Sequence, residues 1–378
     1  MTPTRRQALA ALLPPPLWAA LWTPPSAHAE GAPPPDVARG VDPRPLVFPR
    51  DHGAHPDTRT EWWYITGELS ADSGDAPTHG FQVTFFRSRT DVGEHPSRFA
   101  ARQLLFAHAA VTDLGSGRLL HDQRIAREGF GVAQASRQDT RLVLRDWTLA
   151  RRALGDGARY QARIDSVAAG FAFELDIDTT QPMLLQGEDG YSRKGPQPGQ
   201  ASHYYSQPQL RVAGRLRRDG RWAPVHGRAW LDHEWSETLL HPEALGWDWI
   251  GMNLDDGSAL TAFRLRRADG GNVWSGGSFR PVGTVKPQVY EGPQALRFTP
   301  LRHWRSPATG TRYPVDWAVQ TPDARYEVRA LADGQELDSR GSTGSIYWEG
   351  LSALHDARGR RIGSGYLEMT GYAARLQL

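Results

Sequence analysis

The sequence predicts an all-β protein built from two antiparallel β-barrels in tandem. Three observations support this fold class: short runs that alternate apolar with polar residues, turn signals between the runs, and an internal repeat. Long stretches with helical periodicity are scarce. The clearest runs are Trp62–Leu69, Gly80–Arg89, Leu104–Asp113, Arg141–Leu149, Arg159–Val167 and Ala172–Asp178. The clearest turns are Asp113–Gly115, Gly155–Gly157 and Asp255–Gly257.

The repeat indicates two copies of one β-unit. Its first segments share a Trp, a second aromatic residue, an Ile and a Leu at identical spacing. Three pairs of segments match: Glu61–Leu69 with Gly246–Leu254, Val83–Arg89 with Leu260–Arg266 and, more weakly, Trp230–Asp232 with Tyr366–Glu368. A unit of this size is expected to close as an up-and-down barrel, because closure removes exposed sheet edges.

The first residues carry the pattern of an export signal. Arg5 and Arg6 precede the apolar stretch Ala8–Trp22 and the small-residue site Ala27–Ala29, and paired arginines favour the twin-arginine route. A retained membrane anchor is the alternative, but Pro14–Pro16 interrupts the stretch. We therefore expect a periplasmic or secreted protein. Its expected parts are a signal peptide at 1–29, a Pro-rich linker at 30–47, and barrels at 48–240 and 241–378.

Composition excludes several classes of function. The chain of 378 residues has a net charge of +2 and no block of like charge, so we expect no nucleic-acid partner. It contains no cysteine, which excludes disulfides, thiol catalysis and thiolate metal sites. No segment after the signal is apolar for long enough to span a membrane. Scattered histidines lead us to expect no metal, and no nucleotide-binding motif suggests a cofactor.

Residues 227–267 stand out as a candidate site. Two expected strands, Ala229–Ser236 and Gly246–Leu254, flank a connector that contains Pro242. Because side chains alternate between faces on a strand, Leu231, His233 and Trp235 share one face, and Trp230, Asp232 and Glu234 share the other. In the second strand Trp247 and Trp249 share a face, with Asp248 opposite. Acids and an imidazole among tryptophans indicate a pocket.

Seven ordered motifs give the chain a family resemblance. They are Glu61–Gly67, Phe106–Asp113, Tyr204–Ser206, Asp232–Trp235, Gly246–Trp249, Tyr347–Gly350 and Gly365–Tyr372. Together they resemble the carotenoid 1,2-hydratase (hydroxyneurosporene synthase) family and its AttH-like relatives, often called predicted secreted hydrolases. The resemblance covers the chain from about Phe48 onward. It implies two lipocalin-like barrels and an acid-catalysed hydration, isomerisation or cyclisation of a hydrophobic isoprenoid, polyene or lipid-like substrate.

The resemblance also implies site residues. Asp248 is the expected proton donor, because a carboxylic acid buried among apolar side chains can stay protonated near neutral pH. His233 is the expected orienting or water-handling partner, and Trp235 and Trp247 the wall that faces a developing cation. Glu234 is a weaker candidate, since it faces away from His233. Further expected pocket residues, placed by motif alone, are Trp63, Arg87, His108 and Tyr205.

Other readings of the same residues stay open. The tryptophans and His108 could belong to the core, and Asp232 and Glu234 could pair with arginines such as Arg228. The protein could be a carrier of a lipophilic ligand that serves an inner-membrane transporter, or a structural envelope module. Two catalytic classes lack support. The sequence has no Gly-x-Ser-x-Gly motif of an α/β-hydrolase. His233-Glu234 resembles the start of the zinc motif His-Glu-x-x-His, but Glu237 stands where that motif needs its second histidine.

Overall fold

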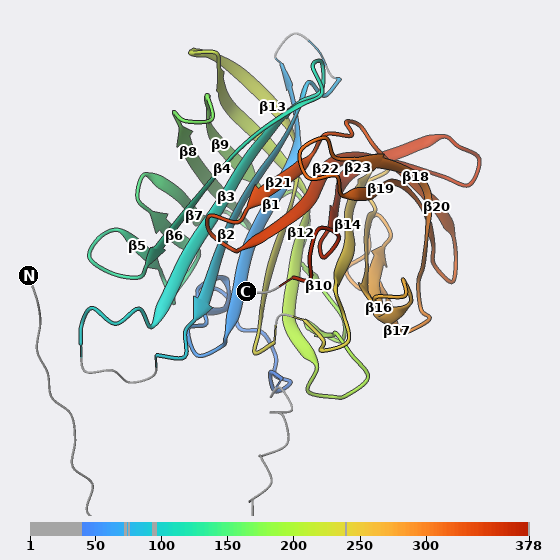
Figure 1. Cartoon of the computed structure of the whole chain (residues 1–378), viewed down its shortest axis with the longest axis horizontal. Helices are drawn as coiled ribbons and strands as arrows, with labels where there is room; N and C mark the ends of the chain where they lie inside the picture. The colour runs from blue at the N-terminus through green and yellow to red at the C-terminus, as the bar shows by residue number, and fades with distance from the viewer. Residues whose placement is uncertain (1–39, 72–73, 75, 93–96, 239, 377–378) are drawn as a thin grey trace, which may run out of the picture. The chain divides into compact units, whose positions relative to one another are not determined.

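The protein consists of two curled antiparallel sheets that follow one another along the chain (Figure 1). The structure, a computed structural model, describes residues 40–71, 74, 76–92, 97–238 and 240–376. Within them the only helical element is the short 3-10 turn η1 (Arg50–His52). The predicted all-β fold is confirmed. The expected signal peptide, and the linker up to residue 39, lie outside the described residues.

The first sheet contains thirteen strands among the described residues and runs in the order β4-β3-β2-β1-β13-β12-β9-β8-β7-β6-β5, with β10 and β11 paired to β12. Its strands are β1 (Thr60–Ala71), β2 (His79–Arg89), β3 (Gln103–Asp113), β4 (Arg118–Arg127), β5 (Ala133–Ala135), β6 (Arg141–Leu144), β7 (Trp147–Leu154), β8 (Gly157–Ser166), β9 (Phe171–Asp178), β10 (Leu184–Leu185), β11 (Tyr191–Arg193), β12 (Ala201–Arg218) and β13 (Arg221–Ser236).

The second sheet contains ten strands and runs in the order β17-β16-β15-β14-β23-β22-β20-β19-β18, with β21 paired to β22. Its strands are β14 (Gly246–Leu254), β15 (Ala259–Arg266), β16 (Asn272–Arg280), β17 (Gln288–Gly292), β18 (Arg297–Arg305), β19 (Arg312–Gln320), β20 (Arg325–Ala330), β21 (Glu336–Ser339), β22 (Ser345–His355) and β23 (Arg361–Met369). The chain passes from one sheet to the other between Ser236 and Gly246.

Each sheet curls around its own core, so the two halves are barrel-like. The hydrogen-bonded path of each sheet ends at an edge strand, and neither barrel is closed by a continuous ladder within the described residues. The first core includes Trp63, Leu231 and Trp235, and the second includes Ile250 and Trp317. Alternation along the strands therefore directs every second side chain into a barrel and the others out of it.

One sequence-predicted strand is divided in the structure. The run Arg141–Leu149 forms two strands, β6 and β7, joined by a turn in which Arg145 has a φ of 58°. The left-handed conformation at Arg145 reverses the chain, and Leu144 then faces Trp147 across a hairpin. Leu142, Leu144, Trp147 and Leu149 are all buried, so a run of alternating residues across a tight turn resembles one longer strand.

The repeat has a direct structural counterpart. β1 lies between β2 and β13, and β14 lies between β15 and β23. The register pairs Tyr64 with Asp232 in the first sheet and Trp249 with Glu368 in the second. The weak match between the two ends of the copies thus marks equivalent strands, each of which pairs with the first strand of its own sheet.

The outer faces of these central strands pack against one another. Their aromatic and aliphatic side chains, including Tyr64, Trp230, Trp249, Leu351 and Tyr366, form a third apolar cluster between the sheets. Gly251 permits this approach, because a Cβ there would lie 2.4 Å from the ring of Trp249. Residues 38–378 form one compact unit. Among the described residues, no helix has the length and apolarity needed to cross a membrane.

Candidate functional site

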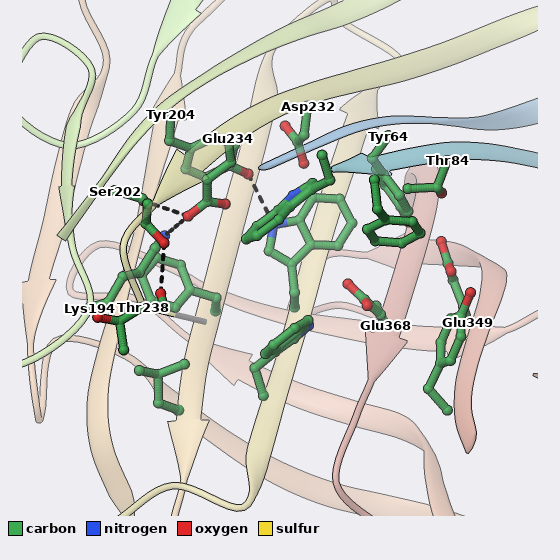
Figure 2. Close-up of a pocket in the computed structure, with 18 residues that line it drawn as sticks. Tyr64, Thr84, Lys194, Ser202, Tyr204, Asp232, Glu234, Thr238, Glu349 and Glu368 are labelled. Carbon is green, nitrogen blue, oxygen red and sulfur yellow. Dashed lines mark hydrogen bonds and ion pairs between the residues drawn. The ribbon is translucent and has the colours of Figure 1, made fainter. Parts of the chain in front are cut away.

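A cavity of about 100 Å³ lies between the two sheets, where their outer faces meet (Figure 2). Several waters could fit, since one needs roughly 10–15 Å³. Side chains from β1, β2, β12 and β13 line it on one side, and side chains from β14, β15, β22 and β23 line it on the other. The lining residues used below are Trp62, Tyr64, Lys194, Ser202, Tyr204, Asp232, Glu234, Trp247, Trp249, Phe263, Leu265, Glu349 and Glu368.

Aromatic side chains from equivalent positions of the repeat form the cavity walls. Trp62 and Tyr64 come from β1, and Trp247 and Trp249 occupy the matching positions of β14. Tyr64 and Trp249 meet edge to face, with ring centroids 5.4 Å apart. The indole of Trp249 donates a hydrogen bond to the hydroxyl of Tyr204, at 3.2 Å. These contacts hold Tyr64, Tyr204 and Trp249 in place in the wall, and aromatic rings of this kind can attract positive charge through their faces.

Two carboxyl groups lie side by side in one wall. Glu349 on β22 and Glu368 on β23 are directly opposite each other in the sheet, so their Cβ atoms are roughly 5 Å apart. Burial raises the pKa of Glu368 to about 7. Burial, and then the charge of Glu368, raise the pKa of Glu349 well above its usual range. Ionisation of Glu368 therefore makes ionisation of Glu349 less favourable, because two like charges in this buried position repel each other.

Asp232 is a third protonatable carboxyl on the first-sheet side of the cavity. Its Oδ1 accepts hydrogen bonds from the indole of Trp230, at 2.8 Å, and from the hydroxyl of Ser206. Burial raises the pKa of Asp232 to about 7 despite these hydrogen bonds. Both hydrogen-bond donors are neutral groups, so they only partly offset the cost of ionising this buried carboxyl.

The opposite part of the cavity is polar and charged. Lys194 forms an ion pair with Glu234 at 3.0 Å, and Ser202 donates a hydrogen bond to the same carboxylate. The ammonium of Lys194 also lies 4.1 Å from the ring centroid of Phe263. Figure 2 shows Lys194, Ser202 and Glu234 on one side of the view and Glu349 and Glu368 on the other. The cavity is thus amphipathic, with an aromatic middle.

A different acid cluster lies inside the first barrel. Glu61 accepts hydrogen bonds from His55 (2.7 Å), His233 (2.9 Å) and Arg87 (2.7 Å). Burial alone would raise the pKa of Glu61, but hydrogen bonds from both histidines and the nearby charges hold it far below its usual range. Burial lowers the pKa of His233 to about 4. We call Glu61, His55, His233 and Arg87 the interior cluster.

Three members of the interior cluster could offer ligands to a metal. One donor atom each from His55, Glu61 and His233 lies within 4.8 Å of the others. Every one of these atoms is already engaged, because Glu61 bonds to both rings and its second oxygen contacts Arg87. A guanidinium beside the carboxylate would also oppose a divalent cation. The contacts of the cluster are those of a hydrogen-bonded core network.

The sequence-predicted residues divide among four places. Glu234 and Trp247 line the cavity. His233, Trp235, Trp63, Arg87 and Tyr205 lie inside the first barrel, where the hydroxyl of Tyr205 bonds to His52 and His233. His108 lies outside that barrel and bonds to Tyr347 and Ser342 of the second sheet.

Asp248, the expected proton donor, lies in the interior of the second barrel. Its carboxylate contacts Arg264 at 2.7 Å and accepts a hydrogen bond from Tyr372 at 2.8 Å. It does not line the cavity, because alternation on β14 sends Trp247 and Trp249 into the cavity and Asp248 the opposite way. The structure therefore does not bring Asp248, His233 and Trp235 together.

Sequence reasoning passed over the cavity acids. Asp232, Glu349 and Glu368 belong to the family motifs, but the sequence did not indicate a catalytic role for them. The alternative in which Arg228 pairs with Asp232 or Glu234 also differs from the structure, where Arg228 pairs with Glu68 and Asp255. A signal existed: Trp230–Asp232 and Tyr366–Glu368 are matched ends of the repeat, and each ends in an acid. No sequence motif indicated Lys194, which is notable only because lysine is rare in this chain.

Comparison with known proteins establishes the family. The AttH-like family matches residues 39–372. A protein described as AttH from Nitrosomonas europaea is 44% identical, with a TM-score of 0.80, over 88% of this chain and 98% of its own. Kievitone hydratase from Nectria haematococca shares the fold at 15% identity and a TM-score of 0.57, over 83% of this chain and 89% of its own.

CghA shares the fold at 12% identity and a TM-score of 0.50, over 82% of this chain and 88% of its own. No curated protein matches the chain significantly. The resemblance seen in the sequence is thus confirmed at the level of the AttH-like, lipocalin-like family. Carotenoid hydratases as such are not among these matches. The chain belongs to the AttH-like family.

Proposed function

We propose that this protein is an enzyme that protonates a carbon–carbon double bond of a hydrophobic substrate in the cavity between its sheets. Hydration is the reaction we favour. Isomerisation and cyclisation are related outcomes, because all three can follow from the carbocation that protonation of the double bond produces. The observation that carries the proposal is the pair of neighbouring carboxyls, Glu349 and Glu368, in an aromatic cavity. Kievitone hydratase, which shares the fold, supports the reaction class by its name.

Glu368 is the proposed proton donor. Unlike Glu349, which is 2% exposed, Glu368 keeps part of its surface open to the cavity. With a pKa near 7 it is largely protonated at slightly acidic pH, yet it is a far stronger acid than water. Burial and then the charges of Asp232 and Glu234 raise the pKa of Glu368 and so resist its ionisation until a cation forms nearby. Glu349, the cross-strand neighbour of Glu368, acts as a positioning residue.

The steps of hydration balance within this site. The proton of Glu368 and the π electrons of the alkene form a new C–H bond, which leaves a cation on the other carbon. Trp247 and Trp249 face that cation, and each ring contributes about 0.5–2 kcal/mol of attraction. Water in the cavity then bonds to the cationic carbon. The carboxylate left on Glu368 takes the proton that this water loses, which restores the acid.

Turnover of a prenylated probe tests this function. Kievitone and neurosporene are incubated with the protein in D₂O, and products are analysed by mass spectrometry for one added water and one carbon-bound deuterium. We expect Glu368→Gln to reduce turnover by about 10²–10⁴-fold, the usual contribution of a general acid. Glu327→Gln, on the outer strand β20, is the matched control. Full turnover by a folded Glu368→Gln variant would exclude this donor.

A non-catalytic carrier is the second candidate, and the polar end of the cavity favours it. The Lys194–Glu234 ion pair could anchor the head group of a lipophilic ligand without any chemistry. Unchanged recovery of a tightly bound ligand would support this function. Export through the twin-arginine route, a periplasmic or secreted location and an inner-membrane transporter as partner remain proposals that rest on the N-terminal pattern and the resemblance.

A further inference from the structure

The cavity carries more acidic than basic groups. Four carboxyl groups line it (Asp232, Glu234, Glu349 and Glu368) against the single ammonium of Lys194. Lys194 is already paired with Glu234. Among the described residues, Asp232 accepts hydrogen bonds from neutral groups, and Glu349 and Glu368 lie opposite each other, so none of these three carboxyls is paired with a basic side chain. Any positive ligand that enters therefore meets uncompensated acidic groups.

Two buried polar atoms at the acidic end are poorly satisfied. Oε1 of Glu349 and the hydroxyl of Tyr64 form no hydrogen bond of good geometry within the described part of the chain, although the hydroxyl lies close enough to the Glu349 carboxyl to oppose the rise in its pKa that burial causes. Both residues line the cavity, where Tyr64 is 6% exposed and Glu349 is 2% exposed. Buried polar atoms normally find well-aligned partners, so these two atoms leave bonding capacity for a ligand in the cavity.

The aromatic walls complete a site for a cation. Trp62, Tyr64, Trp247 and Trp249 line the same space, and aromatic cages recognise quaternary ammonium groups. A cation that leaves water loses hydration, and the cavity offers both ring faces and carboxylates in return. A neutral ligand of the same shape gains only apolar contact.

We propose that this cavity binds lipophilic ammonium ions, with the charged nitrogen between the Glu349–Glu368 pair and the indole faces and with the hydrocarbon chain along Phe263 and Leu265. The inference shares its cavity with the proposed function but does not require turnover. Such an ion resembles the carbocation of the hydration reaction, so it would occupy the position where positive charge develops.

Binding of the ammonium ion is coupled to proton release. The groups that face the nitrogen site are Asp232 and Glu234 from β13, Glu349 and Tyr347 from β22, Glu368 from β23, Tyr64 from β1, Tyr204 from β12 and Lys194. Protonated carboxyls must lose a proton to compensate a fixed positive charge. Affinity therefore rises with pH while these carboxyls titrate, by up to about tenfold per pH unit for each proton released.

Calorimetry with two matched ligands tests the inference. Decyltrimethylammonium chloride, a fixed cation, is compared with N,N-dimethyldecylamine N-oxide, a neutral ligand of similar size, from about pH 5.5 to about pH 8. Both are used below their critical micelle concentrations, in two buffers with different ionisation enthalpies. At the upper pH we expect the cation to bind at least about tenfold more tightly than the N-oxide, and its binding to release protons.

Variants assign the effect to the cavity. We expect Glu349→Gln to lower the affinity for the ammonium ion about tenfold and to reduce its dependence on pH. The control Glu327→Gln, a carboxyl paired with Arg329 on β20, should change neither. Equal affinity for the two ligands at every pH would overturn the inference while leaving a hydrophobic cavity and the proposed function intact. Failure of both ligands to bind would count against both proposals.

Discussion

The interior cluster and the cavity each hold carboxyl groups removed from bulk water, and the effects on their pKa values are opposite. Glu61 is fully buried and has its pKa held far below its usual range, whereas burial raises the pKa of Glu368 to about 7. The difference lies in the partners. Glu61 contacts Arg87, His55 and His233, and Glu368 has a second carboxyl, Glu349, as its cross-strand neighbour.

The comparison shows that burial alone does not define an acid site. A buried carboxylate with a guanidinium partner contributes to stability and is a poor proton donor, because its proton is already lost. A buried carboxyl beside another carboxyl costs stability and retains a proton near neutral pH. In this protein the first arrangement lies inside a barrel and the second lies between the barrels, next to a cavity that a ligand could enter.

The largest expected effect separates the two sites directly. Glu61→Gln would leave the buried Arg87 without its carboxylate, and we expect the free energy of unfolding to fall by about 3–5 kcal/mol. Glu368→Gln, the same substitution in the cavity, should leave stability unchanged or raise it at neutral pH. Chemical denaturation measures both. A similar loss in the two variants would contradict the comparison.

The pH dependence of the free energy of unfolding should reflect both the cavity carboxyls and the interior cluster. Asp232 has its pKa raised from 3.8 to about 7, so the folded state holds its proton more strongly and stability falls as pH rises through that window, by at most about 4 kcal/mol. Glu61 has a lowered pKa, so its contribution is complete above its ordinary value of 4.5 and is lost as pH falls below it. Asp232→Asn should reduce the fall in stability that occurs as pH rises toward 7, and it should leave the loss of stability at low pH unchanged.

Asp248→Asn tests the placement of the sequence-predicted proton donor. The substitution weakens the contact with Arg264 inside the second barrel, and we expect a loss of about 1.5–3 kcal/mol in unfolding free energy. Turnover of the prenylated probe by the folded variant decides its role. Persisting turnover agrees with a structural residue, and its loss without unfolding would restore the catalytic assignment.

The smallest expected effect compares two buried hydroxyls. The hydroxyl of Tyr205 contacts His52 and His233, so Tyr205→Phe should cost about 1 kcal/mol. The hydroxyl of Tyr64 forms no hydrogen bond of good geometry within the described residues, so Tyr64→Phe should cost less than Tyr205→Phe. Thermal unfolding of both variants measures the difference. A greater loss from Tyr64→Phe would show that its hydroxyl is satisfied in solution.

Local patterns predicted which residues share a face of each strand, but not which part of the protein that face contacts. Alternation correctly placed His233 and Trp235 on one side of β13 and Asp232 and Glu234 on the other. It also placed Asp248 opposite Trp247. The predicted site residues stand close together in the sequence and in family motifs, but the structure places them in four different environments.

The all-β class, the tandem repeat and the AttH-like family could all be predicted from the sequence, because strand periodicity, turn residues and motif spacing are local properties of the chain. Which side of each strand borders the cavity depends on how the sheets pack, which no local pattern contains. Glu349 and Glu368 lie nineteen residues apart in sequence yet become direct neighbours by the register of β22 and β23. Asp232 and Lys194 join them only when the two sheets pack, and pKa values follow from those long-range contacts.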